Sequence, residues 1–298
     1  MDSATFESVS GDCERKQSLR STAGVHALTV LARVINDPKF DLHNAGINRR
    51  VLGAAHAHVE RHFGAAIRQY VEEWTIDATD QRNVERKIEE LAWVNTVIYA
   101  MRGFRPGQRF HGDFFFMHSV TSSLFLSSVV SCLTPRSQEV LLRAYFGVCL
   151  TFFVARGCRQ IDIRRFYAET DPYPRPPITS LPYPSSDALT GASADAALPN
   201  AWASLLQNGM VHPDEHFPKI QRTLAHFSSI YGSRPAGLRD LAETELEGAE
   251  ILDGSLFIRA AGLTADSMGR VLDGEPNSVR WHGRNVSMVS DSYGRADH

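Results

Sequence analysis

The chain has 298 residues, of which 43% are hydrophobic and 22% are charged. These fractions are typical of a folded globular protein, and a chain of this length can bury a large apolar core. The net charge is -3 at pH 7, so the molecule has no overall positive charge that would attract a nucleic acid. This argues against a nucleic acid as a partner.

The cysteines and the apolar segments indicate the compartment. The four cysteines are far apart and include no CxxC pair, which favours a reducing environment. The N-terminus is polar and has no apolar signal segment. The longest strongly apolar segment, FGVCLTFFVA at residues 146–155, is ten residues long, too short to cross a bilayer. We therefore expect a cytoplasmic protein without a membrane partner.

Apolar residues that recur every three or four positions predict helices in the first third of the chain. Residues 1–20 lack this period, and we expect them to be disordered. Helices are predicted over residues 21–37, 45–74 and 83–102.

The middle of the chain is its most apolar part. One helix is predicted from about residue 113 to 133, and a second from Pro135 to about residue 156, where Gly157 stops it. Both are apolar nearly all round, so we expect them at the centre of a helical bundle.

The second half begins with a short predicted helix at residues 161–170. Residues 171–199 are rich in Pro, Ser and Ala and predict a long irregular loop. Three further helices are predicted at residues 201–209, 214–231 and 256–272, with a short strand at 278–283 and a frayed tail at 283–298. The expected fold is an all-α, irregular multi-helix bundle, with a single helical domain over residues 21–282.

The sequence contains none of the common catalytic motifs. It has no GxGxxG after a strand, no Walker loop, no GxSxG and no HExxH. Any chemistry must therefore be assembled from separate side chains on the helices.

The first candidate site is HGDFFFMH at residues 111–118. On one straight helix, His111 and His118 would share a face but lie about 10.5 Å apart along the axis, which is awkward for two ligands of one ion. Asp113 is a suitable N-cap, so His111 can precede the helix and fold back towards His118. The alternative is that His118 is a core histidine and His111 an exposed loop residue.

The second candidate site is HPDEHFPKIQRTLAH at residues 212–226. His216 and Lys219 are three residues apart and can share one helix face. A protonated lysine is not a metal ligand, so Lys219 would need a lowered pKa or conversion to a carbamate. The alternative is a capped surface helix with an ordinary solvated lysine.

His58 and His62 form a third group, with the i, i+4 spacing of helical zinc sites. Glu60 lies on the wrong side of the helix to act as the base of an HExxH site. A zinc hydrolase built on this pair needs a third ligand that the sequence does not identify, and a half-exposed pair of surface histidines is the alternative.

Three segments together resemble the questin oxidase-like family. They are FHGDFFFMHSVTSSLFLSS at 110–128, DEHFPKIQRTL at 214–224 and SLFIRAAGLTADSM at 255–268. The resemblance extends from roughly Ala23 to Trp281. Typical members carry a further helical region before this point, so the resemblance implies an N-terminally shortened chain. Apolar surface left uncovered by that region would favour a homo-oligomer.

The resemblance implies an oxidoreductase that inserts oxygen into a polycyclic aromatic polyketide, such as an anthraquinone, by Baeyer–Villiger-type ring cleavage. The implied cofactors are NADPH and a non-haem Fe(II), and the implied partner is an aromatic small molecule. By the same resemblance, His111, His118 and Lys219 are candidate catalytic residues and iron ligands, with His216 as a substitute ligand for Lys219.

A different class of function remains open at this point. A catalytically incomplete binding or accessory protein would use the same apolar cavity to hold an aromatic ligand. The two hypotheses differ in whether His111, His118 and either Lys219 or His216 converge on one cavity.

Overall fold

The fold is given by a computed structural model that describes residues 24–41, 45–47, 52–174, 200–268 and 281. These residues form helices and turns without a strand, which confirms the predicted all-α class. The predicted disordered segment 1–20, strand at 278–283 and tail at 283–298, and most of the predicted loop at 171–199, lie outside the described residues.

The first helices agree with the sequence periodicity except at their ends. They are α2 (Ala27–Asn36), the 3₁₀ turn η1 (Pro38–Phe40), α4 (Leu52–Glu73) and α5 (Gln81–Gly103). α2 begins six residues later than predicted because residue 26 has an extended backbone and caps the helix with its side chain.

The helix predicted over residues 113–133 is two helices, so that prediction was wrong in part. α6 (Phe114–Ser123) and α7 (Leu126–Val130) are separated by a turn, and α8 (Pro135–Ala155) follows. The hydroxyl of Ser122 donates to the carbonyl of His118 at 2.7 Å, and that of Ser123 donates to the carbonyl of Val120 at 2.6 Å. Such bonds compete with the helical ladder and help to end α6.

The later helices are α9 (Ile163–Glu169), α10 (Ala201–Val211), α11 (His216–Tyr231), α12 (Arg239–Ala242), the 3₁₀ turn η3 (Ala249–Ile251) and α13 (Ser255–Met268). The short elements α12 and η3 were not predicted, because four and three residues carry too little periodicity to detect.

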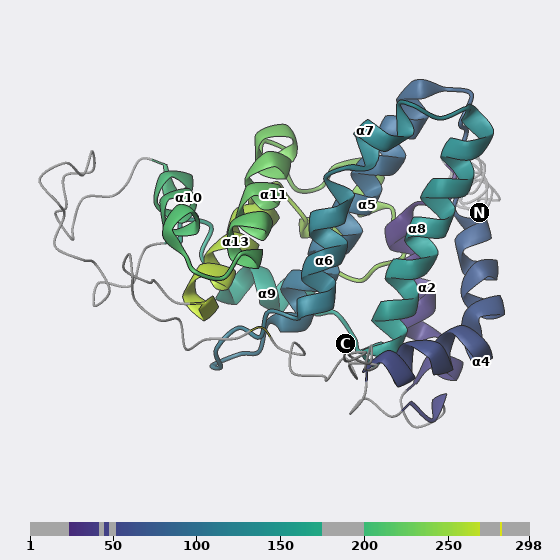
Figure 1. Cartoon of the computed structure of the whole chain (residues 1–298), viewed down its shortest axis with the longest axis horizontal. Helices are drawn as coiled ribbons and strands as arrows, with labels where there is room; N and C mark the ends of the chain where they lie inside the picture. The colour runs from purple at the N-terminus through teal and green to yellow at the C-terminus, as the bar shows by residue number, and fades with distance from the viewer. Residues whose placement is uncertain (1–23, 42–44, 48–51, 175–199, 269–280, 282–298) are drawn as a thin grey trace, which may run out of the picture.

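The central helix is α5, not α6 or α8 as predicted. α5 contacts α2, α6, α7, α8 and α13, and all its residues from 91 to 101 are buried. In Figure 1, α10, α11 and α13 lie on one side of α5 and α6, whereas α2, α4 and α8 lie on the other. α8 remains at the surface, where Val140 and Val148 are each 51% exposed.

Among the described helices, α8 alone is long and apolar enough to cross a membrane by length and composition. Half of its most apolar stretch is buried inside the protein. The core helix of a globular protein passes the same test, so this feature is weak evidence for a membrane span.

Glu90 joins three helices through its buried carboxylate, which is 3% exposed. One oxygen accepts from the main-chain N–H of Ala27 at 2.9 Å and from the indole N–H of Trp74 at 2.7 Å. The other accepts from the ammonium of Lys87 at 2.5 Å. The start of α2, the residue after α4 and the body of α5 are therefore held at one point.

We expect Glu90→Ala to lower the free energy of unfolding by about 3–5 kcal/mol, because it leaves the buried ammonium of Lys87 without its partner. Glu85→Ala, at an exposed position of the same helix, is the matched control and should change it by less than about 0.5 kcal/mol. Urea denaturation measures both, and equal effects of the two substitutions would contradict the assigned role of Glu90.

His26 caps α2 with an imidazole nitrogen, since its Nδ1 accepts from the N–H of Leu28 at 3.0 Å. A protonated imidazole has no free lone pair and cannot accept this bond. Burial lowers the pKa of His26 below its ordinary value of 6.5, although the nearby Glu90 opposes the shift. The unfolded chain therefore takes up this proton first as the pH falls, so the stabilisation is complete above pH 6.5 and is lost below it.

We expect the unfolding free energy of the wild type to fall by about 1 kcal/mol, the size of a helix cap, more than that of His26→Asn between pH 7.5 and pH 5. Asparagine caps a helix without titrating, so the variant keeps every other pH-dependent group. Thermal denaturation at several pH values gives the comparison, and parallel curves for the two proteins would rule out the cap as the sensitive group.

Candidate functional site

The N-terminus of α6 is fixed by Asp113, as the sequence predicts. One carboxylate oxygen of Asp113 accepts from the N–H groups of Phe115 and Phe116, at 3.0 and 3.2 Å. The other accepts from the guanidinium of Arg156, which caps the C-terminus of α8. Asp113 is 6% exposed, so this ion pair ties the start of α6 to the end of α8.

His111 precedes α6 but does not reach the cavity described below. The chain after α5 folds back, so that the N–H of His111 donates to the carbonyl of Gly103 at 2.9 Å. The ring of Phe110 fills the place of a Cβ at Gly103, 2.5 Å from where that atom would be. His111 is exposed and does not line the cavity. The prediction that it converges with the other candidates is not met.

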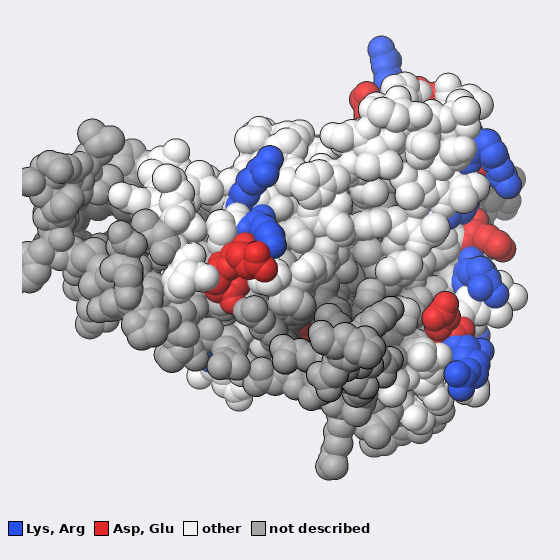
Figure 2. Space-filling model, in the orientation of Figure 1, with Lys and Arg blue, Asp and Glu red and all other residues white. Residues whose placement is uncertain are grey.

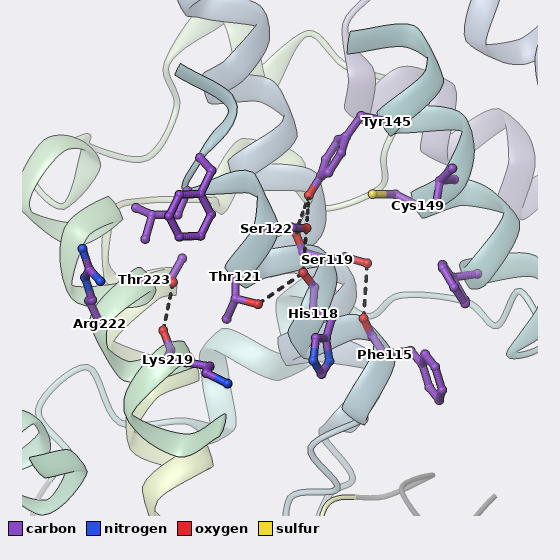
Figure 3. Close-up of a pocket in the computed structure, with 14 residues that line it drawn as sticks. Phe115, His118, Ser119, Thr121, Ser122, Tyr145, Cys149, Lys219, Arg222 and Thr223 are labelled. Carbon is purple, nitrogen blue, oxygen red and sulfur yellow. Dashed lines mark hydrogen bonds between the residues drawn. The ribbon is translucent and has the colours of Figure 1, made fainter. Parts of the chain in front are cut away.

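A cavity of about 570 Å³ lies between α6, α8 and α11 (Figure 3). Its wall is mainly apolar and aromatic. It is lined by Phe115, His118, Ser119, Thr121, Ser122, Leu124, Phe125, Tyr145, Val148, Cys149, Phe152, Lys219, Arg222 and Thr223. Of the four candidate residues from the sequence, His118 and Lys219 are among these.

The hydroxyl groups of the cavity are already engaged with the main chain. Tyr145 donates to the carbonyl of Ser119 at 2.6 Å, and Thr223 donates to that of Lys219 at 2.9 Å. The remaining hydroxyls donate to carbonyls of α6, from Ser119, Thr121 and Ser122. These groups therefore need no ligand to satisfy them.

The sulfur and phenol groups on α8 are held in their neutral forms. Burial raises the pKa of Cys149 to about 12, so its thiol stays protonated at neutral pH. Burial also raises the pKa of Tyr145 well above its usual range. The thiolate is the nucleophilic form of cysteine, so Cys149 contributes shape and not reactivity to the wall.

His118 and His216 approach each other beside this cavity, with ring centroids 5.3 Å apart. The ring of Phe114 packs against both imidazoles. Nδ1 of His118 lies 2.7 Å from the carbonyl of Phe114, which can only accept, so Nδ1 carries a proton. In the neutral imidazole, Nε2 then keeps its lone pair. His118 is exposed, and its Nε2 is available as a base or ligand.

His216 is the more buried of the two, at 8% exposed. Its Nδ1 lies 3.2 Å from the carboxylate of Asp214, which orients the ring. Burial lowers the pKa of His216, while Asp214 opposes the shift. Next on α11, the ammonium of Lys219 lies 3.5 Å from the carboxylate of Glu215.

These residues do not complete a metal site in the described part of the chain. An iron site needs at least three protein ligands, and the described residues contain no group of three or more His, Cys, Asp or Glu side chains placed to hold one ion. His118 and His216 form a pair, His111 lies elsewhere, and the ammonium of Lys219 interacts with Glu215. We therefore derive no step through iron.

His58 and His62, the third histidine group, also lack the third ligand that a metal site needs. The rings of His58 and His62 lie 4.5 Å apart, but Nε2 of His58 lies 3.0 Å from the carbonyl of Ala45. The described residues offer no third ligand there.

Sequence reasoning missed the cavity-lining residues of α8 and two of α11, Arg222 and Thr223. Tyr145, Cys149 and Phe152 follow the helical period and face α6, but in an apolar run this spacing indicates only a core. Arg222 is three residues after Lys219, and this spacing on one helix face was a usable signal.

We expect Asp113→Ala to lower the unfolding free energy by about 1 kcal/mol more than Asp113→Asn does, because asparagine still caps α6 and alanine does not. Both variants lose the charge that pairs with Arg156, which makes the asparagine variant the control for the ion pair. Guanidinium denaturation measures the difference, and equal losses would show that the cap contributes nothing.

Comparison with known proteins gives one family. A family model described as questin oxidase-like matches residues 2–224. This range includes α6, α8 and the cavity-lining residues of α11, but not the 255–268 segment that also suggested the resemblance. A search of curated proteins found no match.

Proposed function

The chain belongs to the questin oxidase-like family, and on that premise we propose that it is an oxidase whose aromatic substrate binds in the cavity between α6, α8 and α11. The family places the protein among oxidoreductases. Oxygen insertion into an anthraquinone-like polyketide, of the Baeyer–Villiger type, is the finer form of the proposal.

The observation that carries the proposal is an aromatic cavity with a histidine at its edge. Phe115 and Phe152 lie parallel, with ring centroids 5.6 Å apart and planes at 23°. Phe125 adds a third ring and is 56% exposed. Flat aromatic walls of this kind fit a planar ring system, and a cavity of about 570 Å³ is in the range of small-molecule sites.

His118 is the residue that we assign to proton transfer. Its Nε2 lone pair can accept a proton from a phenol of the substrate, while the Phe114 carbonyl holds the Nδ1 proton in place. The apolar wall excludes water from the bound ring. In the overall reaction as proposed, one atom of O₂ would enter a ring C–C bond beside a ketone and the other would leave as water; NADPH, if it is the reductant, would supply the hydride, and solvent the proton, for that reduction.

A second candidate is a binding protein that holds the same aromatic ligand without turning it over. The observation that favours it is the incomplete set of metal ligands among the described residues. The two functions share the cavity and differ only in whether bound ligand is converted.

We expect Val148→Trp to weaken the binding of 1,8-dihydroxyanthraquinone by at least about tenfold, because the larger side chain fills the cavity. Val140→Trp is the matched control, since both valines are 51% exposed on α8 but only Val148 lines the cavity. Fluorescence titration measures the binding. Equal affinity in the two variants would place the ligand elsewhere and overturn the proposal.

His118→Gln separates the two candidate functions. We expect it to leave the dissociation constant within about twofold and to lower turnover by about 100-fold, the usual contribution of a general base. Turnover is followed as substrate-dependent O₂ and NADPH consumption, with the iron content of the purified protein measured in parallel. Binding without consumption in the wild type, with or without added Fe(II), would identify the protein as a binding protein.

A further inference from the structure

We propose that two copies of this chain form a symmetric dimer through the exposed face of α8 that carries Val140, Ala144 and Val148. The inference goes beyond the proposed function and does not depend on it. It rests on an apolar helix that is left half uncovered, on the spacing of its exposed residues and on the charge around them.

α8 leaves much of its apolar surface facing outwards. Only half of its most apolar stretch is buried inside the protein. Val140 and Val148 are each 51% exposed, while Phe125, which precedes α7, and Val129 within it are 56% and 48% exposed. Phe125 and Val148 both line the cavity, so the two apolar groups meet at its rim. An exposed apolar face that joins several elements in this way marks an interaction site.

The exposed residues of α8 are spaced for self-association. Val140, Ala144 and Val148 follow one another at intervals of four and form a single ridge, the kind that interdigitates in the commonest packing of two helices. The order of side chains along this ridge is the same in both directions. A twofold axis at Ala144 therefore sets Val140 of one copy against Val148 of the other, which is the self-complementary contact of a symmetric dimer. The small side chain on the axis lets the two helices approach closely.

The charge of this face also favours a second copy. In a symmetric dimer, a charge near the axis meets the same charge of the other copy, which is unfavourable. Among the exposed residues of α7 and α8, all of which the structure describes, Arg136 alone is charged, and it lies eight residues from Ala144. In Figure 2 the surface over α6, α7 and the adjoining part of α8 is uncharged, and the charged side chains lie at its edges. A second copy therefore meets no like charge close to the proposed axis.

A lipid surface is the main alternative occupant, and the charges argue against it. Peripheral membrane sites attract anionic lipids with basic side chains around an apolar face. The two arginines of α8 already have partners within the protein, since Arg136 pairs with Glu139 at 3.5 Å and Arg143 donates to the carbonyl of Val71 at 2.7 Å. The chain also carries a net charge of -3. An uncharged protein surface therefore fits this face better than an anionic membrane.

The face is large enough for a weak but specific dimer. α8 spans 21 residues, or about 30 Å, and a helix with its side chains is about 10 Å wide. Together with α6 and α7, α8 offers roughly 600 Å² on each copy, so a dimer would bury about 1,200 Å² in total. That total is at the lower end of the range of stable interfaces, and we expect a dimer that dissociates on dilution. Since Phe125 and Val148 line the cavity, the second copy would cover part of its rim.

Analytical ultracentrifugation of the full-length protein tests the dimer. We expect the wild type to be dimeric at about 100 μM and mostly monomeric below about 1 μM, as an interface of this size implies. Ala144→Glu places a carboxylate against that of the other copy at the axis and should weaken the dimer by at least about tenfold. Ala203→Glu, at an exposed position of α10 outside this face, makes the same chemical change and should leave the dimer intact.

A pair of opposite charges identifies the twofold axis. Ala144→Lys should weaken the dimer as Ala144→Glu does, whereas an equimolar mixture of the two variants should form a heterodimer, because the two charges then attract. Circular dichroism of each variant verifies the helical fold, which a substitution at this exposed position leaves intact. Restoration in the mixture supports the symmetric contact through α8, since charges that do not face each other cannot restore it.

Three results would overturn the inference. They are a wild type that is monomeric at every concentration, a dimer that Ala144→Glu leaves unchanged, and a mixture of the two charge variants that stays monomeric. Binding of the wild type to vesicles of neutral or anionic phospholipid, lost in Ala144→Glu, would assign the face to a lipid surface instead. Ligand titrations below about 1 μM protein keep the chain monomeric, so the comparison of Val148→Trp with Val140→Trp is independent of this interface.

Discussion

The buried carboxylate of Glu90 is the constraint on which the arrangement of the helices depends. A charge at this depth is tolerated only when its lone pairs are occupied. Here the donors come from the start of α2, the residue after α4 and the preceding turn of α5. Meeting that requirement brings three separate stretches of chain to one point. α5 is thereby fixed in the middle of the bundle, where it supports α6 on one side and α13 on another.

The all-α class and the approximate positions of the helices could be predicted from the periodicity of apolar residues. This period is a property of each helix and does not depend on which helices pack against it. How deeply each helix is buried in the bundle could not be predicted from the sequence. The most apolar long helix, α8, has one face exposed at the surface. The central helix α5, in contrast, has Lys87, Asn95 and Thr96 among its buried residues. Hydropathy counts the polarity of a side chain and not its partners. A helix whose polar side chains find hydrogen-bond partners, as Lys87, Asn95 and Thr96 do, can therefore be buried despite a polar average.

Prediction of the site succeeded locally and failed over long distances. The Asp113 cap and the position of His118 inside α6 follow from spacing within a few residues. The approach of His118 to His216, 98 residues later in sequence, depends on the contact between α6 and α11, which no local pattern encodes. His111 was misplaced because the fold-back onto Gly103 is a packing event of the preceding loop and not a property of α6.

Because the thiol of Cys149 stays protonated, this side chain resists oxidation. The oxidase reaction proposed for this cavity would expose nearby side chains to partly reduced oxygen species. Such species convert thiolates to sulfenic acids and then to irreversibly oxidised acids. A thiol whose pKa is raised to about 12 offers almost no thiolate to this reaction. Burial in the wall thus acts as a chemical shield and allows a cysteine to serve as apolar lining where an exposed one would be lost to oxidation.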